Sequence, residues 1–445
     1  MGVAAHLASA GMSASDAVSR EALFATLARD GGRILDGAPE AHRFTPGRIE
    51  VFGKHTDYAG GHSLLAAVPR GMALAARRRR DRRVRVGDVF DGQVIEVDPA
   101  VETPPYVHGL QRYVSVVSHR LHVNFPGCDL GSNIAIASDL PRASGLSSSS
   151  ALIVGVALAL IDRAGLRERD AWRAHIRSLH DLAWYLGCVE NGLDFPGLPG
   201  SSGVGTLGGS EDHTAILTSR ADHVSLCRFV PAMPIGETRM PDDWTFVIAS
   251  SGIQADKADS VRDRYNRASH GVRALHAIWN RHAAVPAPSL ADALTSRGDA
   301  VDRLKGWLTP TADGAFSSGD LARRLDHFVG ETARAPLALE AFRAADHRAL
   351  GALAAASQRD AAELLGNQLP ETSALVRLAR ELGAFASSSF GAGFGGSVWA
   401  AIPVSDAELF GRDWVRAYAA QYPALGEVPW FTARPAPATM AFSLR

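Results

Sequence analysis

The sequence predicts a mixed α/β or α+β fold in which strands and helices follow one another along the chain. Short apolar runs that suit buried strands stand at 49–52, 133–137, 244–249 and 397–402. Longer stretches with apolar residues at helical spacing stand at 151–164 and 171–191. The chain shows no internal repeat. This order of elements is typical of layered mixed folds and argues against a sandwich or a repeat array.

The N-terminal part is predicted to begin with a helix and to continue into strands. Helical periodicity starts near residue 19 and places Leu23 and Leu27 on one face. A polar break separates this helix from the strand at 49–52. The stretch 71–86 alternates in polarity and is basic, and it predicts a hairpin.

The later elements divide the chain into two parts. A Gly-, Pro- and Ser-rich insertion at 195–209 follows the second long helix. The run Trp244–Ala249 predicts a buried strand that opens a second domain. Helices dominate from there to about Gly383, and the strand at 397–402 closes the pattern. We therefore place the boundary between residues 240 and 241.

Composition limits the class of protein. The chain has 445 residues, enough for two domains, and its hydrophobic and charged fractions are 46% and 21%. The formal net charge of −1 creates no global field toward nucleic acid or a membrane. The three cysteines, Cys128, Cys188 and Cys227, lie far apart without CxxC or metal-ligand spacing. This set argues against a disulfide framework and fits a reducing compartment.

The apolar patterning predicts a cytoplasmic protein without a membrane partner. Residues 1–20 are rich in Ala and Ser and lack the pattern of a secretory signal. No uninterrupted apolar stretch approaches the roughly 20 residues that span a bilayer. The 16 histidines show no HExxH spacing, and we infer no zinc site.

One basic run, 77–83, invites comparison with nucleic-acid-binding segments. It contains a single Asp and no aromatic residue that could stack on a base. The neutral balance of the whole chain favours a solvated strand end or turn at this position. We therefore expect no nucleic-acid partner.

The central motif is a serine-rich loop directly before an apolar helix. It has the sequence Pro141-Arg-Ala-Ser-Gly145-Leu-Ser147-Ser148-Ser149-Ser150-Ala151. Small residues let the backbone approach an anion, and the helix directs unpaired N–H groups and its positive dipole end toward that anion. The hydroxyls add donors, and one could ligate Mg²⁺ between phosphates. The loop is neither a Walker motif nor a GxSxG elbow, and a serine N-cap with a polar linker is the alternative.

Two further blocks contain glycines beside polar residues. In the first, Pro46–Gly61, a predicted strand carries Arg48 and ends in His55-Thr-Asp57-Tyr, a cluster that offers donors and acceptors for sugar hydroxyls. The other is Ser387-Ser-Ser-Phe-Gly-Ala-Gly-Phe-Gly-Gly-Ser397, just before a strand. Its glycines permit backbone conformations closed to other residues and leave room beside a ligand.

In their order and spacing, the three blocks resemble the three signature motifs of the GHMP kinases. The first block is similar to the galactokinase signature, whose usual form is GRxNxIGEHTDYxxG. The segment 208–213 stands where that family has a CGxMDQ-like segment, and 357–372 is similar to the stretch before its last glycine-rich loop. The resemblance runs from about Pro46 to the C-terminal strands and covers most of the chain.

The resemblance implies a two-lobed GHMP kinase fold with the active site in the cleft between the lobes. An S5-like N-terminal lobe, expected at 19–240, would carry the first two blocks. A ferredoxin-like C-terminal lobe, expected at 241–445, would supply the last glycine-rich loop. ATP and the substrate are expected on opposite sides of Asp212.

The resemblance also implies a role for individual residues. Asp212 would be the catalytic carboxylate, and Arg48 would keep it ionised and stabilise charge on the transferring group. Ser149 and Glu190 would ligate Mg²⁺ beside the phosphates of ATP, although Glu190 could equally be a solvated helix residue. The phosphate loop would comprise Gly145, Ser147, Ser148, Ser149 and Ser150. The sugar ligands would be Lys54, His55, Asp57 and Tyr265.

Lys54 departs from the signature, because galactokinases have Glu at this position. Glu is expected to accept a hydrogen bond from the sugar, whereas Lys only donates and carries positive charge. One hypothesis is therefore a substrate with a carboxylate, such as galacturonate. The other is that Lys54 points away or pairs with an acid, and that the sugar is neutral. Smaller departures are Ser210-Glu211 before Asp212 and His213 after it.

The implied activity is ATP-dependent phosphorylation of a sugar hydroxyl, at the anomeric C1 of galactose or a related sugar. A uronic-acid 1-kinase and a catalytically silent sugar- and ATP-binding regulator remain as alternatives. The implied cofactors are ATP and Mg²⁺, and the partner is a small-molecule sugar. The sequence does not predict the oligomeric state.

Overall fold

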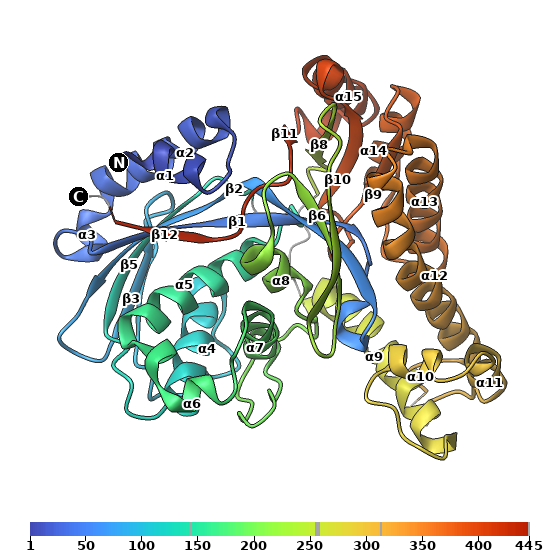
Figure 1. The fold of residues 1–445 in the computed structure, drawn as a ribbon, viewed down its shortest axis with the longest axis horizontal. Coiled ribbons are helices and arrows are strands. Elements are labelled where there is room, and N and C mark those ends of the chain that lie inside the picture. The colour runs from blue at the N-terminus through green and yellow to red at the C-terminus, as the bar shows by residue number, and fades with distance from the viewer. Residues whose placement is uncertain (142–143, 254–258, 312–313, 444–445) are drawn as a thin grey trace.

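The computed structural model of the chain contains two sheets with helices packed on them (Figure 1). It describes residues 1–141, 144–253, 259–311 and 314–443, with backbone only at 259–261. Arg142 and Ala143 of the serine-rich loop therefore lie outside the described residues, as does part of the stretch before Tyr265.

The first sheet forms the centre of the N-terminal lobe. Its strands are β1 (Ala41–Phe52), β2 (His62–Arg78), β3 (Val84–Asp88), β4 (Val94–Val97), β5 (Ser132–Ser138), β6 (His223–Arg228), β7 (Met233–Arg239) and β12 (Met440–Phe442). Their order is β12–β1–β2–β5–β3–β4, and β6 pairs with both β2 and β7. The strands β3 and β5 are parallel, and the other pairs are antiparallel.

Helices cover both faces of this sheet because successive side chains of a strand point to opposite sides (Figure 1). On β5, Ile134 and Ile136 belong to the main apolar core, whereas Ala135 and Ala137 belong to a separate cluster on the other face. The main core includes residues of α4 (Gly109–Asn124), α5 (Ser148–Ala164), α6 (Asp170–Arg173) and α7 (Leu179–Asn191). The second cluster is made with α1 (Val3–Ser9), α2 (Ala14–Asp30) and α3 (Gly32–Leu35).

The second sheet belongs to the C-terminal lobe. It has the order β11–β8–β10–β9, with β8 (Trp244–Ser250), β9 (Ala386–Ser389), β10 (Ser397–Pro403) and β11 (Trp430–Ala433). One face packs on α12 (Ser318–Arg343) and α13 (His347–Asp360) through the main core. The other packs on α14 (Pro370–Glu381) and α15 (Ala407–Gln421).

A helical extension and several short turns complete the described chain. The extension packs α9 (Asp259–His282), α10 (Leu290–Thr295) and α11 (Ala300–Gly306) against the N-terminal half of α12. The helix α8 (Glu211–Thr218) lies near the centre of the molecule (Figure 1). The short turns are η1 (Asp57–Ala59), η2 (Leu166–Glu168), η3 (Ala361–Leu365), η4 (Val404–Asp406) and η5 (Pro423–Leu425).

The two lobes share one apolar core, and the chain passes between them more than once. Phe52 of the first sheet packs edge-on against Trp399 of the second, with ring centroids 6.1 Å apart. The last strand, β12, returns to the first sheet and pairs with β1. Residues from Val3 onward also pack on the first sheet, before the expected start at residue 19. The division into 19–240 and 241–445 itself stays a prediction.

Two sequence-based element predictions were wrong. The stretch 71–86 is no hairpin, because β5 lies between β2 and β3 and pairs with both. Local alternation cannot show that a strand from 132–138 will separate two neighbours in sequence. The helix predicted over 171–191 is interrupted, with α6 ending at Arg173 and α7 starting at Leu179. Ser178 caps α7 by accepting a hydrogen bond from the Asp181 amide.

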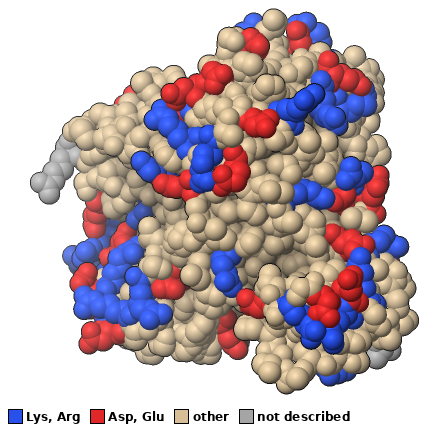
Figure 2. Space-filling model, turned by 45° about the vertical axis from the view of Figure 1, so that its right-hand side comes forward, with Lys and Arg blue, Asp and Glu red and all other residues tan. Residues whose placement is uncertain are grey.

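The basic run at 77–83 is paired with acidic residues. Arg79 forms ion pairs with Asp81 and Glu96, and Arg83 pairs with Glu96. On the face shown in Figure 2, basic and acidic residues lie interspersed. Among the described helices, none is long and apolar enough to cross a membrane. The three cysteines are buried as free thiols.

Candidate active site

All three motif blocks meet at one pocket. The first block contributes the end of β1 and the loop after it, the second contributes the start of α5, and the third contributes the turn after β9. The start of α8, the end of α7 and one face of α9 complete the wall. The lining residues are Arg48, Glu50, His55, Asp57, Tyr58, Gly145, Ser147, Ser148, Ser149, Ser150, Glu190, Asn191, Thr206, Gly208, Gly209, Glu211, Asp212, His213, Arg262, Tyr265, Gly391 and Ala392.

Arg48 and Asp212 form an ion pair in this pocket. Arg48 projects from β1 and is 4% exposed, and its Nε lies 2.6 Å from Asp212 Oδ1. A second nitrogen, Nη1, donates to the carbonyl oxygen of Gly145 at 2.5 Å. Asp212 stands in the first turn of α8, and its other oxygen accepts a hydrogen bond of 2.5 Å from Ser147. The pair thus links the first block, the second block and α8 around one carboxylate.

The surroundings keep Asp212 ionised. Burial alone would raise the pKa of this carboxyl, but the Arg48 guanidinium and the Ser147 hydroxyl lower it below its ordinary value of 3.8. About a quarter of the side chain remains exposed to the pocket, at 26%. A negative carboxylate open to a cleft can accept a proton or a hydrogen bond from a bound hydroxyl.

The serine-rich loop has the geometry of an anion site. The helix α5 begins at Ser148, so its first N–H groups lie at the end that lines the pocket. Gly145 and Gly391 both have a positive φ of 76° and lie close to each other. A Cβ on Gly391 would stand 3.2 Å from the Gly145 carbonyl oxygen, so the second and third blocks approach closely.

Oxygen ligands that suit Mg²⁺ stand beside this loop. Ser149 and Glu190 both line the pocket, and within the described part of the chain the Ser149 hydroxyl bonds to no other residue. Ser150 Oγ lies 2.9 Å from Glu190 Oε2, and His213 Nε2 lies 3.0 Å from the same oxygen. A hydroxyl and a carboxylate fit a hard cation that also takes phosphate and water oxygens. The described residues contain no cluster of three His, Cys, Asp or Glu for a metal.

His55, Asp57 and Tyr265 also line the pocket and lie close to one another. The rings of His55 and Tyr265 have centroids 5.2 Å apart. Asp57 Oδ2 accepts from the Glu211 amide at 3.1 Å, which places it beside the first turn of α8. Burial is the main reason that the pKa of Asp57 is raised to about 6, and nearby Asp212 adds to it. Gly209 permits this approach, since a Cβ there would stand 2.2 Å from the Asp57 carboxylate.

Lys54 is the predicted site residue that the structure does not bring to the pocket. Its side chain is fully buried, and Nζ donates to Ser357 Oγ at 2.7 Å and to Ser388 Oγ at 3.0 Å. Glu331 Oε1 lies 3.8 Å from the same nitrogen. The lysine is directed toward Glu331 of α12 because a buried ammonium group needs a buried partner of opposite charge. The prediction that Lys54 contacts the substrate is therefore not supported.

Sequence reasoning missed a second pair of carboxyl groups in the pocket wall. Glu50 lies two residues after Arg48 on the same face of β1, and Glu211 precedes Asp212. Glu211 also accepts a 2.7 Å hydrogen bond from Ser63. Burial raises the pKa of Glu50 to about 7 and, with Glu50 beside it, raises that of Glu211 well above 4.5. The available signal was that Glu50 stands where the galactokinase signature has Asn.

Models of known families match three parts of the chain. The galactokinase galactose-binding signature matches residues 35–78, the GHMP kinase N-terminal domain matches 110–181, and the GHMP kinase C-terminal domain matches 338–420. Each range contains one of the three blocks, at 46–61, 141–151 and 387–397, and the ranges lie in the order expected from the motifs.

Curated proteins and solved structures agree with these matches. The chain is 30% identical to a galactokinase of Exiguobacterium sibiricum over 84% of its length and 87% of the relative. It is 28% identical to a galactokinase of Roseiflexus sp. over 84% and 86%. In fold it resembles Lactococcus lactis galactokinase complexed with galactose, with a TM-score of 0.75 over 94% of this chain and 99% of that one at 22% identity. A mevalonate kinase of Methanococcus jannaschii gives a TM-score of 0.55 over 90% and 99% at 13% identity. The chain therefore belongs to the galactokinase family of the GHMP kinases and is an ATP-dependent sugar kinase.

Proposed function

We propose that this sugar kinase transfers the γ-phosphoryl group of ATP to the anomeric C1 hydroxyl of galactose or a closely related neutral sugar. The observation that carries the proposal is the Arg48–Asp212 pair, in which an ionised carboxylate faces a pocket bounded by all three motif blocks. The named substrate of the curated relatives supports galactose.

In the proposed reaction, Asp212 accepts the proton of the C1 hydroxyl as its oxygen attacks. A bond forms between that oxygen and the γ-phosphorus, and the bond from the γ-phosphorus to the bridging oxygen breaks to release ADP. Arg48 stabilises negative charge on the transferring group while it keeps Asp212 ionised. The N–H groups at the start of α5 and the loop serines hold the phosphates.

Mg²⁺, when bound with ATP, neutralises charge on the phosphate oxygens, and Ser149 and Glu190 are the residues that would hold it. On the sugar side, His55, Asp57 and Tyr265 offer acceptors and donors for hydroxyl groups. The assignment of these residues rests on their place in the pocket and on the motif resemblance.

The charge of the pocket favours a neutral sugar over a uronate. Lys54 does not line the pocket, so the cation that suggested a carboxylate substrate is missing there. Among the acids that do line it, Asp212 is held ionised, whereas burial raises the pKa values of Glu50, Asp57 and Glu211. A sugar carboxylate would therefore meet negative charge close to the site of transfer.

The test is ATP consumption by the purified protein with Mg²⁺ against galactose, arabinose, N-acetylgalactosamine, galacturonate and glucuronate. ³¹P NMR of the product identifies the hydroxyl that is phosphorylated. We expect turnover with galactose and a sugar 1-phosphate, with Asp212→Asn as the inactive control. Preference for a uronate would contradict the neutral-sugar proposal. Binding of ATP and sugar without turnover would instead favour the silent regulator.

A further inference from the structure

The loop that follows β1 is attached to α12 at two points. Glu331 Oε1 accepts from the backbone amides of Gly53 at 3.0 Å and Lys54 at 3.3 Å. Two turns earlier on the helix, Arg324 Nη2 donates to the His55 carbonyl oxygen at 2.6 Å and to Tyr58 Oη at 3.0 Å. Residues seven apart lie on the same face of a helix, so α12 holds the whole loop from one side.

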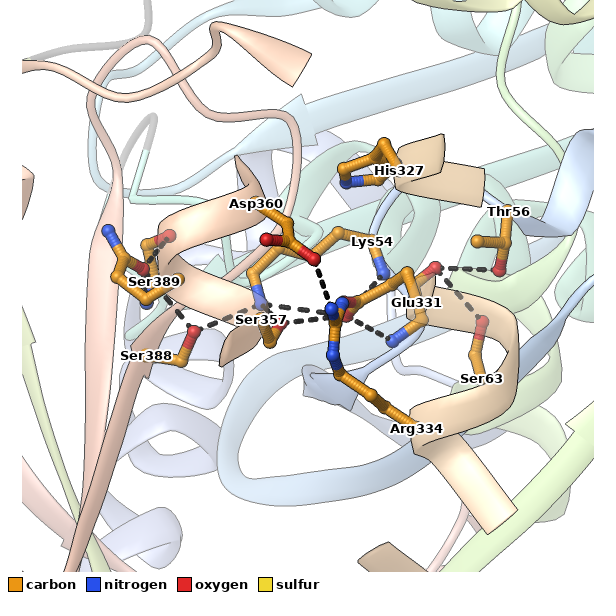
Figure 3. Close-up of polar contacts among 12 residues, drawn as sticks. Lys54, Thr56, Ser63, His327, Glu331, Arg334, Ser357, Asp360, Ser388 and Ser389 are labelled. Carbon is orange, nitrogen blue, oxygen red and sulfur yellow. Dashed lines mark hydrogen bonds and ion pairs between the residues drawn. The ribbon is translucent and has the colours of Figure 1, made fainter. Parts of the chain in front are cut away.

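The first of these attachments depends on Lys54 (Figure 3). Glu331 is fully buried, and a buried carboxylate needs charge compensation and hydrogen bonds. Burial would raise the pKa of Glu331, but Lys54, the Gly53 amide and Arg334 lower it below 4.5, so the group is ionised. Without Lys54, the carboxylate that orders the Gly53 and Lys54 amides would lose one of its two cationic partners and keep only Arg334.

The lysine also joins the loop to the C-terminal lobe. Its Nζ bonds to Ser357 of α13 and Ser388 of β9, and Ser357 donates in turn to Glu331 Oε1 at 2.8 Å. Arg334 joins the other oxygen of Glu331 to Asp360, which balances two cations against two carboxylates. The neighbouring His327 is held neutral, because burial and the Arg324 charge lower its pKa well below 6.5.

We propose that Lys54 and Glu331 are positioning residues that fix the loop carrying His55 and Asp57 and thereby set the affinity for the sugar. This inference rests on the proposed function, because His55 and Asp57 are taken as sugar ligands. The Lys54 side chain does not line the pocket. Its effect on the substrate is therefore transmitted only through the backbone of residues 53–57. A Glu at position 54 would face Glu331 and add an unpaired buried charge.

The test compares Lys54→Met with a matched control in the full-length protein. The control is Lys305→Met, which removes a lysine that pairs with Asp326 of α12 at 2.7 Å, half-exposed and outside the pocket lining. Lys54→Met should raise the KM for galactose about tenfold, with kcat and the KM for ATP changed less than about twofold. Glu331→Gln should act in the same direction, and the double variant should lose little more than either single one.

A second readout does not require turnover. Hydrogen–deuterium exchange of the peptide covering residues 53–61 should be about tenfold faster in Lys54→Met and unchanged in Lys305→Met. An equal rise in both KM values, or exchange of this peptide at the wild-type rate, would overturn the inference. If wild-type protein does not turn over galactose, the proposed function fails while the exchange result still decides whether Lys54 orders the loop. If Lys54→Met does not fold, Glu331→Gln replaces it in both the kinetic and the exchange measurements.

Discussion

Arg48 and Lys54 are buried cations six residues apart on the same segment. They have different functions because they pair with different carboxylates. Arg48 faces the pocket and pairs with Asp212, whose carboxylate is 26% exposed. Lys54 does not line the pocket and pairs with Glu331, which is fully buried. Both lie within the galactokinase signature match. Both carboxylates are bonded to protein groups, but the first remains partly open to the pocket, whereas Glu331 is enclosed by protein on all sides.

A motif position therefore does not determine which way its side chain points. Lys54 would add a cation to the sugar site if it had no buried partner. Glu331 and the two serines supply such a partner, and removing a charge from water requires one. The residues that decide this lie about 280 to 330 positions later in the sequence.

The largest expected effect comes from breaking the Arg48 pair. Arg48→Met should lower kcat by about 10² to 10³, because it removes charge stabilisation at the transferring group. Without the guanidinium the pKa of Asp212 rises, so the base is protonated at higher pH. The acidic limb of the kcat profile should therefore move to higher pH. Steady-state assays between pH 4 and 9 measure both effects.

Arg43→Met is the matched control for this variant. Arg43 also lies on β1 and pairs with a carboxylate, Asp162, at 2.6 Å, but neither residue lines the pocket. Its loss should change kcat by less than about twofold. An equal loss in the two variants would mean that Arg48 matters only for the stability of the strand.

The next prediction concerns Glu50, which forms with Glu211 the second pair of carboxyl groups in the pocket wall. The pKa of Glu50 is raised from 4.5 to about 7, mainly by burial, so the folded protein holds this proton more tightly than the unfolded chain. Wild-type stability from this group is therefore lost as the pH rises from about 4.5 to 7. Gln at position 50 does not titrate. The free energy of unfolding of Glu50→Gln, relative to wild type, should therefore increase through that pH window by about 3 kcal/mol. Unfolding curves against pH measure it, and parallel curves would contradict the assignment.

Glu331 should show the opposite sign. Its folded pKa lies below 4.5, so its contribution to stability is present above that pH and is lost as the pH falls through the folded value. Glu331→Gln should be less stable than wild type at neutral pH, by about 2 kcal/mol, and the gap should narrow in acid. The same unfolding series tests this, and a gap that widens in acid would show that Glu331 is not ionised.

The architecture, and which residues form the site, could largely be predicted from the sequence. The three blocks are local patterns whose glycines and serines indicate their own conformation, and they do meet at the pocket. The position of β5 between β2 and β3 and the orientation of Lys54 could not be predicted from local patterns. Both depend on partners distant in sequence, namely β5 for the strands and Glu331 for the lysine.

The smallest expected effect is at the edge of the sugar site. Tyr265→Phe removes one pocket hydroxyl that lies directly beside Gly208, where a Cβ on the glycine would stand 2.7 Å from it. Loss of one hydrogen bond to the sugar, worth ~1 kcal/mol, should raise the KM for galactose about fivefold. The KM for ATP should not change. An unchanged KM for galactose would remove Tyr265 from the sugar ligands.

The most direct test of the account is the turnover number at saturating galactose and ATP, measured side by side for Asp212→Asn and Lys54→Met. The account predicts that Asp212→Asn loses about 10² to 10⁴ in kcat, because the proton acceptor is gone. We expect Lys54→Met to keep kcat within about twofold of wild type, because saturating sugar restores the bound state. Comparable losses in both variants, or near-normal turnover by Asp212→Asn, would contradict the division of labour between the two buried pairs.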